Sequence, residues 1–501
     1  MEPPLKLAAP LGSQNVHNNA HCGGGLSDLP AHIVHHILSL LHMTDIAFIS
    51  ILSKRCRELC MSAPNLNIDS EILRGSLVRR QRFGNFLDRF MNLCNGMEVQ
   101  TFRLRWIFSR AFCILNEEYR VDTWLHNVVR RNVKELYLDL HPMDRIKAFE
   151  LPLCIFSCGS LRVLNLNLNN GILKLPSVGF TTLQDLTLSG VRIGHNDFGG
   201  WVSSLCKSLM RLNLINVWGI NSLSITTSSL QCLTITVQKG DDLHHINVSA
   251  EKLHTMILFW GNTHTGKSLH VSAPNLRVLS LDGHNANYYC LANFLHVHEA
   301  WIYCLTTPPQ ACSDWSFFQV IRCISQVKSL YIGGKFIQSL ITHGFPQTTL
   351  RNLHSLFLTV RSLEDDLVPS IASFLGGLPS LQKLAIKPKF LSAPSITNNT
   401  LPLEASGFDA EYWESQNLVF VQKLKEAAIE IHSGENEMQL VKYLLKHAKA
   451  LEKITIFCSS LEFCSAKENS PLTFPKLHKI SKRIEEFKKA SSTAAVYLLL
   501  K

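Results

Sequence analysis

The sequence predicts an α/β fold in which a small all-α module precedes a curved solenoid with one long parallel sheet. Two observations support this fold class. About forty residues near the N-terminus carry apolar side chains at helical spacing, and from residue 95 onward a short apolar motif recurs at a nearly even step. The chain has 501 residues, of which 46% are hydrophobic, so it can bury a large core but is too long for one compact domain.

The N-terminal module is predicted from apolar periodicity. Residues 1–25 are rich in Gly, Asn, Pro and His and are predicted to be a disordered tail. Order is expected to begin in "LSDLPAHIVHHILSLLHMTDIAFISILSKRCREL", where one helical face is formed by Ile33, Val34, Ile37, Leu38 and Leu41. Two further short helices are expected, the last with Ser53 as its N-cap. Three short helices enclose little core, so apolar residues on their surface indicate a partner.

Beyond residue 95 the chain repeats one unit: an apolar residue, two variable residues, an apolar, a variable and an apolar residue. The copies are Val99/Phe102/Leu104, Val133/Leu136/Leu138, Leu161/Leu164/Leu166, Leu183/Leu186/Leu188, Leu209/Leu212/Leu214, Leu230/Leu233/Ile235, Leu253/Met256/Leu258, Leu276/Leu279/Leu281, Val297/Ala300/Ile302, Val327/Leu330/Ile332, Leu353/Leu356/Leu358, Leu381/Leu384/Ile386, Leu424/Ala427/Ile429 and Leu451/Ile454/Ile456. Between Val133 and Leu381 the copies start 21 to 30 residues apart. This is the period of leucine-rich repeats, and unrelated strands of an α/β domain explain it less well.

The repeat motif also predicts which side chains face outward. Alternate residues of a strand point to opposite faces, so a single copy cannot bury its apolar positions alone. Stacked copies bury them in a continuous core and form a parallel sheet on the concave face of a curved solenoid. The residues between the core positions are therefore expected to line that concave face.

These concave positions change character along the chain. The early strands present polar residues: Arg103, Arg105, Asn165, Asn167, Thr187 and Ser189. The strands between residues 257 and 357 present apolar and aromatic residues: Ile257, Phe259, Trp301, Tyr303, Tyr331 and Phe357. Because Trp and Tyr dominate binding hot spots, we predict that this stripe is the substrate-binding site. The alternative is a second core covered by long loops.

A nucleotide-binding motif occurs within the repeats. Gly261, Gly266, Lys267 and Ser268 match the phosphate-loop pattern G-x-x-x-x-G-K-[ST]. Such a loop requires a helix behind it, whose N-terminus holds the anion. Here "LHVSAP" follows, which alternates as a strand does and contains a proline. We interpret the match as coincidental and expect no nucleotide or other cofactor.

Other residue types that carry chemistry form no recognisable site. His32, His35, His36 and His42 lie on or just after the first helix, but no cysteine or carboxylate stands at a suitable spacing for a shared metal. The sequence also shows no paired carboxylates and no nucleophile next to a base. We therefore expect no metal and no catalytic residues.

Charge and cysteine usage limit the partners and the compartment. The chain has 49 basic and 39 acidic residues, and their scatter argues against nucleic acid as a partner. No apolar run approaches the ~18 residues of a membrane helix. The chain contains 15 cysteines and no C-x-x-C pair, and its N-terminus lacks a signal-peptide pattern. We expect reduced thiols and a location in the nucleus or cytoplasm.

Specific residues of the N-terminal segment point to a known family. They are Leu29-Pro30, Ile33, Ile37-Leu38, Leu41 and Leu52-Ser53-Lys54-Arg55 followed by Arg57. In these residues the segment resembles an F-box, and "SAPNLNID" at residues 62–69 resembles the tail that leads out of this box in plant proteins. Cys56 stands where the family mostly carries Trp.

The C-terminal part carries a second resemblance. The stretch "LKEAAIEIHSGENEMQLVKYLLKHAKALEKITIF", residues 424–457, is predicted to form a strand, a capped helix and a strand, and it resembles an FBD segment. With the repeats, this identifies the chain as a member of the plant F-box/LRR/FBD group. The implied division is a tail at 1–25, an F-box at 26–66, a linker or capping helical segment at 67–95, a leucine-rich-repeat solenoid at 96–415, an FBD-like segment continuing it at 416–490, and a C-terminal tail at 491–501.

The resemblance implies a substrate-recognition subunit of an SCF-type cullin–RING ubiquitin ligase that performs no catalysis itself. The F-box would bind a Skp-type adaptor and, through it, a cullin, while the repeats would hold a protein substrate. The expected adaptor contacts, some of which could instead pack the helices together, are Leu29, Pro30, Ile33, Ile37, Leu38, Leu41 and Leu52. Two alternatives remain: a non-ligase interaction scaffold, which would not copurify with a cullin, and a small-molecule co-receptor, which would need a deep concave pocket.

Overall fold

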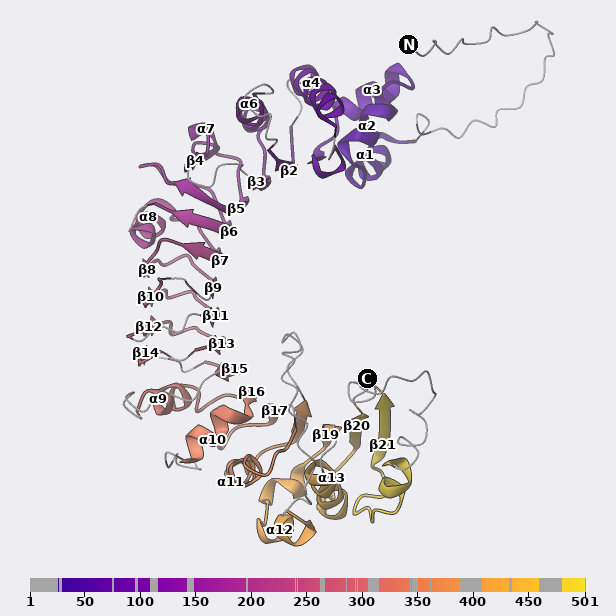
Figure 1. Cartoon of the computed structure of the whole chain (residues 1–501), viewed down its shortest axis with the longest axis vertical. Coiled ribbons are helices and arrows are strands. Elements are labelled where there is room, and N and C mark those ends of the chain that lie inside the picture. The colour runs from indigo at the N-terminus through magenta and orange to yellow at the C-terminus, as the bar shows by residue number, and fades with distance from the viewer. Residues whose placement is uncertain are drawn as a thin grey trace, which may run out of the picture.

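The computed structural model of the chain describes residues 26, 29–73, 76–94, 98–108, 116–141, 148–194, 197–238, 240, 242–261, 266–284, 286–292, 294, 296–304, 315–342, 344, 350–360, 362–387, 408–431, 435–458 and 480–500. The tail expected at 1–25 lies outside these residues. The described chain forms one long curve, with the helical module at one end and the last strands at the other (Figure 1). The predicted α/β solenoid with its parallel sheet on the concave side is confirmed.

The N-terminal module contains the three expected helices: α1 (Ala31–Ser39), α2 (Met43–Ser50) and α3 (Lys54–Met61). Ser53 caps α3 as predicted, because its hydroxyl accepts a hydrogen bond from the Cys56 amide at 3.0 Å. Val34 and Leu38 of α1 and Ile46 of α2 are buried. Both helices pack against the first strand of the long sheet, so the module is joined directly to the solenoid.

The inner face of the curve is a 17-stranded sheet. Its strands are β1 (Asn65–Asp69), β2 (Thr101–Ile107), β3 (Glu135–His141), β4 (Ala148–Glu150), β5 (Val163–Lys174), β6 (Asp185–Ile193), β7 (Arg211–Trp218), β9 (Cys232–Val237), β11 (Thr255–Trp260), β13 (Val278–Gly283), β15 (Glu299–Cys304), β16 (Ser329–Gly333), β17 (Ser355–Thr359), β18 (Lys383–Lys387), β19 (Glu426–Ile431), β20 (Lys453–Cys458) and β21 (Ala495–Leu500). Every pairing is parallel, and equivalent core positions lie side by side, such as Leu136, Leu164 and Leu186. All fourteen predicted copies of the motif supply a strand of this sheet.

The outer side of the curve is covered by two kinds of element (Figure 1). In the middle repeats a second, four-stranded parallel sheet takes this place: β8 (Ser222–Thr226), β10 (His245–Ser249), β12 (Ser268–Ser272) and β14 (Tyr288–Ala292). Elsewhere the cover consists of α4 (Leu77–Leu93), α6 (Glu117–Arg130), α7 (Leu153–Phe156), α8 (Phe198–Leu205), α9 (Trp315–Cys323), α10 (Gly334–Thr342), α11 (Val368–Gly376), α12 (Ala410–Ser415), α13 (Glu435–His447) and the short 3-10 turns η2 (Glu71–Leu73) and η3 (Val419–Lys423). A continuous apolar core runs between the two sides from Val34 to Ile484.

Both ends of the solenoid differ from the expected boundaries. β1 pairs with β2 from residue 65, so the sheet begins ahead of the segment 67–95 that was predicted to be a linker or cap. The expected tail at 491–501 contains β21, which pairs with β20 over its whole length. β1 carries the motif as Ala63/Leu66/Ile68, but these residues fall in the stretch that was assigned to the end of the F-box. Before β21 the first motif position is Thr493, which is polar, so motif spacing does not identify this strand.

A buried ion pair joins α4 to α6. The Arg80 guanidinium binds the Glu117 carboxylate and donates a hydrogen bond to the carbonyl of Ile107. The same guanidinium lies 4.8 Å from the ring centroid of Trp106. Arg80 and Glu117 are both buried, so this contact fixes the helix that follows the module against the first repeats.

The FBD-like segment is held to the solenoid by polar side chains at the start of α13. The Glu437 carboxylate accepts hydrogen bonds from the Leu363 amide at 2.8 Å and the Ser362 hydroxyl at 3.0 Å. The Asn436 amide group donates to the Leu363 carbonyl at 2.8 Å. Because β19 and β20 also continue the sheet, this segment is part of the solenoid, as its strand–helix–strand pattern suggested.

Candidate protein-interaction surfaces

The helical module leaves large apolar side chains in solvent. The most exposed are Leu40 at 74%, Ile51 at 70%, Leu52 at 71% and Phe48 at 69%. Leu29 and Ile33 are exposed to a smaller extent, and Pro30 is also exposed. We call the six exposed large apolar side chains of the helical module the module surface: Leu29, Ile33, Leu40, Phe48, Ile51 and Leu52. An isolated soluble protein rarely exposes so many large apolar groups on one small unit, which marks the unit as a binding surface.

The structure corrects one expected adaptor contact. Leu38 is only 1% exposed, because the side of α1 that carries it faces β1 and the core. It therefore packs the module together and is not available to a partner. Ile37 and Leu41 are half-buried, and Leu41 packs against the core. Leu40, Phe48 and Ile51 were not among the predicted residues, yet they are more exposed than Leu29 and Ile33. Phe48 lies off the buried stripe of α2, and Leu40 and Ile51 directly follow α1 and α2, which is the signal that could have identified them.

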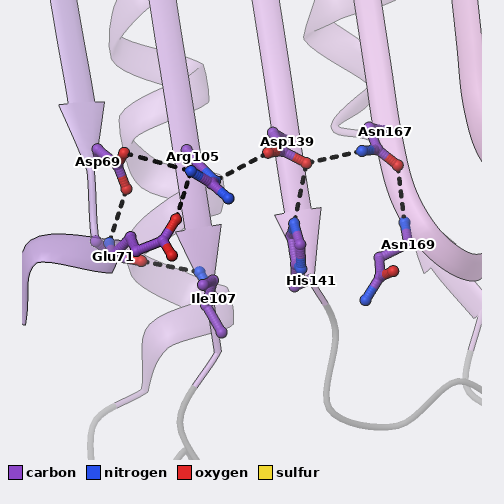
Figure 2. A network of polar contacts seen from close by, with 9 residues as sticks. Asp69, Glu71, Arg105, Ile107, Asp139, His141, Asn167 and Asn169 are labelled. Atoms are coloured by element: carbon purple, nitrogen blue, oxygen red, sulfur yellow. Dashed lines mark hydrogen bonds and ion pairs between the residues drawn. The ribbon is translucent and has the colours of Figure 1, made fainter. Parts of the chain in front are cut away.

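The early part of the concave face carries a polar ladder (Figure 2). Arg105 of β2 is its centre, because its guanidinium binds Glu71, lies 3.2 Å from Asp139 and lies 3.8 Å from Asp69. The carboxylate of Asp139 also accepts a hydrogen bond from Asn167 at 2.9 Å. The predicted polar character of these strands is confirmed. Three carboxylates surround Arg105, while Arg103 of the same strand lies 4.6 Å from the ring centroid of Tyr137.

The predicted aromatic stripe forms one surface. Trp301, Tyr331 and Phe357 occupy aligned positions on β15, β16 and β17, and their rings stack nearly parallel. The centroids of Trp301 and Tyr331 are 3.8 Å apart, and those of Tyr331 and Phe357 are 4.1 Å apart. Tyr303 stands beside Trp301 with its ring at a steep angle, 6.2 Å away. All four rings are half-buried and lie on the concave side, as expected for a surface rather than a second core.

These rings line an open groove of about 400 Å³. We call it the aromatic groove; its lining includes the six predicted residues Ile257, Phe259, Trp301, Tyr303, Tyr331 and Phe357, together with Asp282, Thr359 and Lys387. Ile257 is the most exposed of the six, at 39%. Burial raises the pKa of Tyr303 and Tyr331, so both phenols stay neutral at physiological pH. The groove offers a largely apolar binding site with two phenol hydroxyl groups, those of Tyr303 and Tyr331.

The phosphate-loop match lies in a different setting. Ser268 begins β12, so a strand and not a helix follows the match, of which residues 262–265 lie outside the described ranges. Lys267 is buried, donates a hydrogen bond to the His284 carbonyl at 3.1 Å and lies 5.1 Å from the ring centroid of Trp260. Its ammonium therefore stabilises the interior of the repeats and is not available to a phosphate. This geometry agrees with the interpretation that the phosphate-loop match is coincidental.

The residues that the structure describes contain neither a candidate metal site nor a candidate membrane span. In those residues, no group of three or more His, Cys, Asp or Glu side chains is placed to hold a metal ion. Over the same ranges, no helix combines the length and apolar character needed to cross a membrane.

Cysteine reactivity provides a first prediction. Ten cysteines of the described residues are free thiols, and burial raises the pKa of Cys60, Cys94 and Cys206 to about 11. Burial disfavours the charged thiolate, so these three thiols are protonated at pH 8 and lose the proton only as the pH approaches 11. We expect iodoacetamide to modify the exposed Cys290 at least about a hundredfold faster than the buried three, as measured by mass spectrometry. Equal rates in the folded protein, or reproducible native disulfides among the ten, would contradict this prediction.

Three family models match the chain. Residues 26–67 match the F-box domain, residues 121–289 match "FBD-associated F-box protein At5g56370, LRR repeats", and residues 426–456 match FBD. Curated relatives cover most of the chain. It is 26% identical to the FBD-associated F-box protein At1g66310 of Arabidopsis thaliana, over 90% of this chain and 93% of that protein. It is also 26% identical to the putative F-box/FBD/LRR-repeat protein At4g03220 of the same plant, over 87% and 89% of the two chains.

The module surface, the repeat strands and the strand–helix–strand segment each fall within or overlap the matching model. The chain therefore belongs to the plant F-box proteins that carry leucine-rich repeats and an FBD segment.

Proposed function

We propose that this chain is the substrate-recognition subunit of an SCF-type cullin–RING ubiquitin ligase. The F-box binds a Skp-type adaptor, the adaptor recruits a cullin, and the concave face of the repeats holds the target protein. The chain performs no catalysis and positions the target for ubiquitin transfer. The observation that carries this proposal is the module surface, an exposed apolar patch on the unit that matches the F-box model.

The proposal is tested by reconstitution. The full chain is co-expressed with a Skp-type adaptor and a cullin, purified through a tag on the chain, and analysed by size-exclusion chromatography. We expect one complex that contains all three proteins. Absence of the adaptor would contradict the proposal, whereas an adaptor complex that never recruits the cullin would favour the non-ligase scaffold.

Target capture is expected to depend on the aromatic groove. Replacing Trp301 and Tyr303 by alanine removes two rings that line the aromatic groove, while the core positions of β15 stay intact. The tagged wild-type chain and the tagged double variant are each used to capture proteins from plant extract. We expect target proteins that bind the wild-type chain to be absent from the double variant, while the adaptor binds both. Quantitative mass spectrometry measures both. Tyr137→Ala, which removes a ring from the polar end of the face, is the matched control and is expected to retain the targets.

The folding of the double variant decides how a negative result is interpreted. Circular dichroism and adaptor binding equal to wild type show that the solenoid is intact. If the targets remain bound to a folded double variant, the capture site lies elsewhere. If the double variant unfolds, the rings belong to the core and the proposed role of the groove is wrong.

The size of the aromatic groove favours a second candidate function. Its volume of about 400 Å³ lies within the range of small-molecule sites, roughly 300–1,000 Å³. In this alternative the chain is a co-receptor in which a small ligand completes the target-binding surface. Native mass spectrometry of the complex purified from plant cells tests it, since a bound mass that disappears with Trp301→Ala would favour the co-receptor.

We also propose that the protein acts in the nucleus or the cytoplasm. The free thiols of the described cysteines support this location, because a reducing compartment keeps such thiols unpaired. A fluorescent fusion of the full chain tests it by microscopy, and a signal confined to the secretory pathway would contradict it.

A further inference from the structure

Beyond Phe357 the ladder of aromatic rings stops. The aligned positions on the next two strands are Ala385 of β18 and Ala428 of β19. Thr455 of β20 follows, and Tyr497 of β21 ends the row. Neighbouring strands lie about 4.8 Å apart, so the two alanines leave a gap about two strands wide beside the ring of Phe357, and Thr455 on the next strand separates this gap from the ring of Tyr497.

This gap is part of a second groove of about 450 Å³, which we call the lysine groove. Its floor includes Ala385 and Ala428, and Phe357 and Tyr497 stand on opposite sides of it. The rings of the existing ladder are 3.8 and 4.1 Å apart, which is the spacing of stacked planar groups. A planar ring that entered above Ala385 would therefore continue the stack on Phe357.

The borders of the lysine groove carry an excess of positive charge. Among the described residues that line it are three lysines, Lys383, Lys387 and Lys453, and one carboxylate, Glu426. Glu426 lies 2.8 Å from Lys383 and neutralises that lysine. The ammonium of Lys387 lies 3.9 Å from the ring centroid of Phe457, and that of Lys453 lies 5.1 Å from the centroid of Tyr497. Two cations therefore stand next to aromatic walls at the border of the gap.

We propose that the lysine groove binds an aromatic side chain that stands among acidic residues in an extended segment of the target protein. The ring stacks on Phe357 above Ala385, and neighbouring carboxylates bind Lys387 and Lys453. Such stacking stabilises the ring beyond its burial, and charge-assisted hydrogen bonds to the two lysines select acidic over basic neighbours of the ring. This inference rests on the proposed function, in which the concave face holds the target.

Stacked rings beside lysines also suggest single-stranded nucleic acid, in which bases stack on aromatic side chains. Such a site would also need a basic groove that follows the phosphate backbone along the rings. Here acidic residues flank the ladder: Glu299 accepts a hydrogen bond from the Trp301 indole at 2.8 Å, and Asp282 lines the aromatic groove. The charge pattern therefore favours a peptide.

The proposal is tested by selection of random twelve-residue peptides displayed on phage, with the purified chain–adaptor complex as bait. We expect enriched peptides to share one Phe, Tyr or Trp with at least two Asp or Glu residues within three positions. A synthetic copy of the most enriched peptide is then measured by fluorescence anisotropy. Replacement of its aromatic residue, or of its acidic residues, by alanine is expected to weaken binding at least tenfold.

Two protein variants locate the binding site. Ala385→Trp places an indole in the gap and is expected to weaken peptide binding at least tenfold. Thr187→Trp, which also places an indole on the concave face but at a half-buried position of β6, is the control and is expected to leave binding unchanged. If Ala385→Trp does not fold, Lys387→Glu combined with Lys453→Glu tests the same groove and is expected to weaken binding by a similar factor.

Several outcomes would overturn the proposal: no enriched peptide, enriched peptides that are basic or lack a ring, wild-type affinity in Ala385→Trp, or an oligonucleotide such as oligo-uridine that binds more tightly than the selected peptide. Adaptor binding is measured on the same samples. If the wild-type chain does not bind the adaptor, the proposed ligase role is contradicted, whatever the peptide result. If the adaptor binds but no peptide is enriched, only the proposed class of peptide is contradicted.

Discussion

Replacing Phe48 and Leu52 by alanine is expected to weaken the complex with a Skp-type adaptor by about a hundredfold or more. Both side chains stand in solvent in the free chain, so their removal leaves the core of the module unchanged. Covering one large apolar side chain contributes roughly 1.5–3 kcal/mol, and each ~1.4 kcal/mol corresponds to a factor of ten in affinity. Isothermal titration calorimetry with the purified adaptor measures the effect.

Leu153→Ala is the matched control for this variant. Leu153 is also a leucine largely in solvent, but it lies in α7, in the solenoid. We expect its removal to leave the adaptor affinity unchanged. If the Phe48 and Leu52 double variant binds as tightly as wild type, the module surface is not the adaptor site. A melting temperature equal to wild type confirms that the double variant is folded.

Replacing Glu117 by alanine is expected to loosen the joint between α4 and α6. Without the carboxylate, the Arg80 guanidinium would remain buried as an uncompensated charge, which typically costs about 3–5 kcal/mol. Because a solenoid opens locally, the effect is expected at this end of the chain. Backbone amides of α4 and α6 should exchange with deuterium about two to three orders of magnitude faster, as measured by hydrogen-exchange mass spectrometry.

Glu414→Ala is the control for the buried pair. Glu414 forms an ion pair with Lys446, but both side chains are largely in solvent, so its removal is expected to change exchange very little. Replacing Arg80 by Met together with Glu117 by Leu is expected to restore most of the protection, because no charge is then buried. Unchanged exchange of α4 in Glu117→Ala would show that the pair does not hold the joint.

The repeat architecture was predictable because its determinants are local. Each copy places apolar residues at fixed spacing within one strand, and each strand needs only an equivalent neighbour to bury them. Thus Leu164 and Leu186 identify their strands without knowledge of any distant contact. The stripe from Ile257 to Phe357 was predictable for the same reason, because alternation along a strand determines which side chains face the concave side.

The sequence by itself determined the class of the protein, the number of motif strands and the polar-to-aromatic change along the concave face. Only the tertiary structure decided which apolar residues of the module stay in solvent, because burial depends on where β1 docks: Leu38 faces it, and Leu40 does not. The same holds for the lysine groove. Ala385 and Tyr497 lie more than a hundred residues apart in the sequence and form one site only because three strand pairings bring them onto the same face. Local periodicity determines how one strand is oriented, whereas the neighbours of a side chain on the next strands depend on the register and on the loops between them.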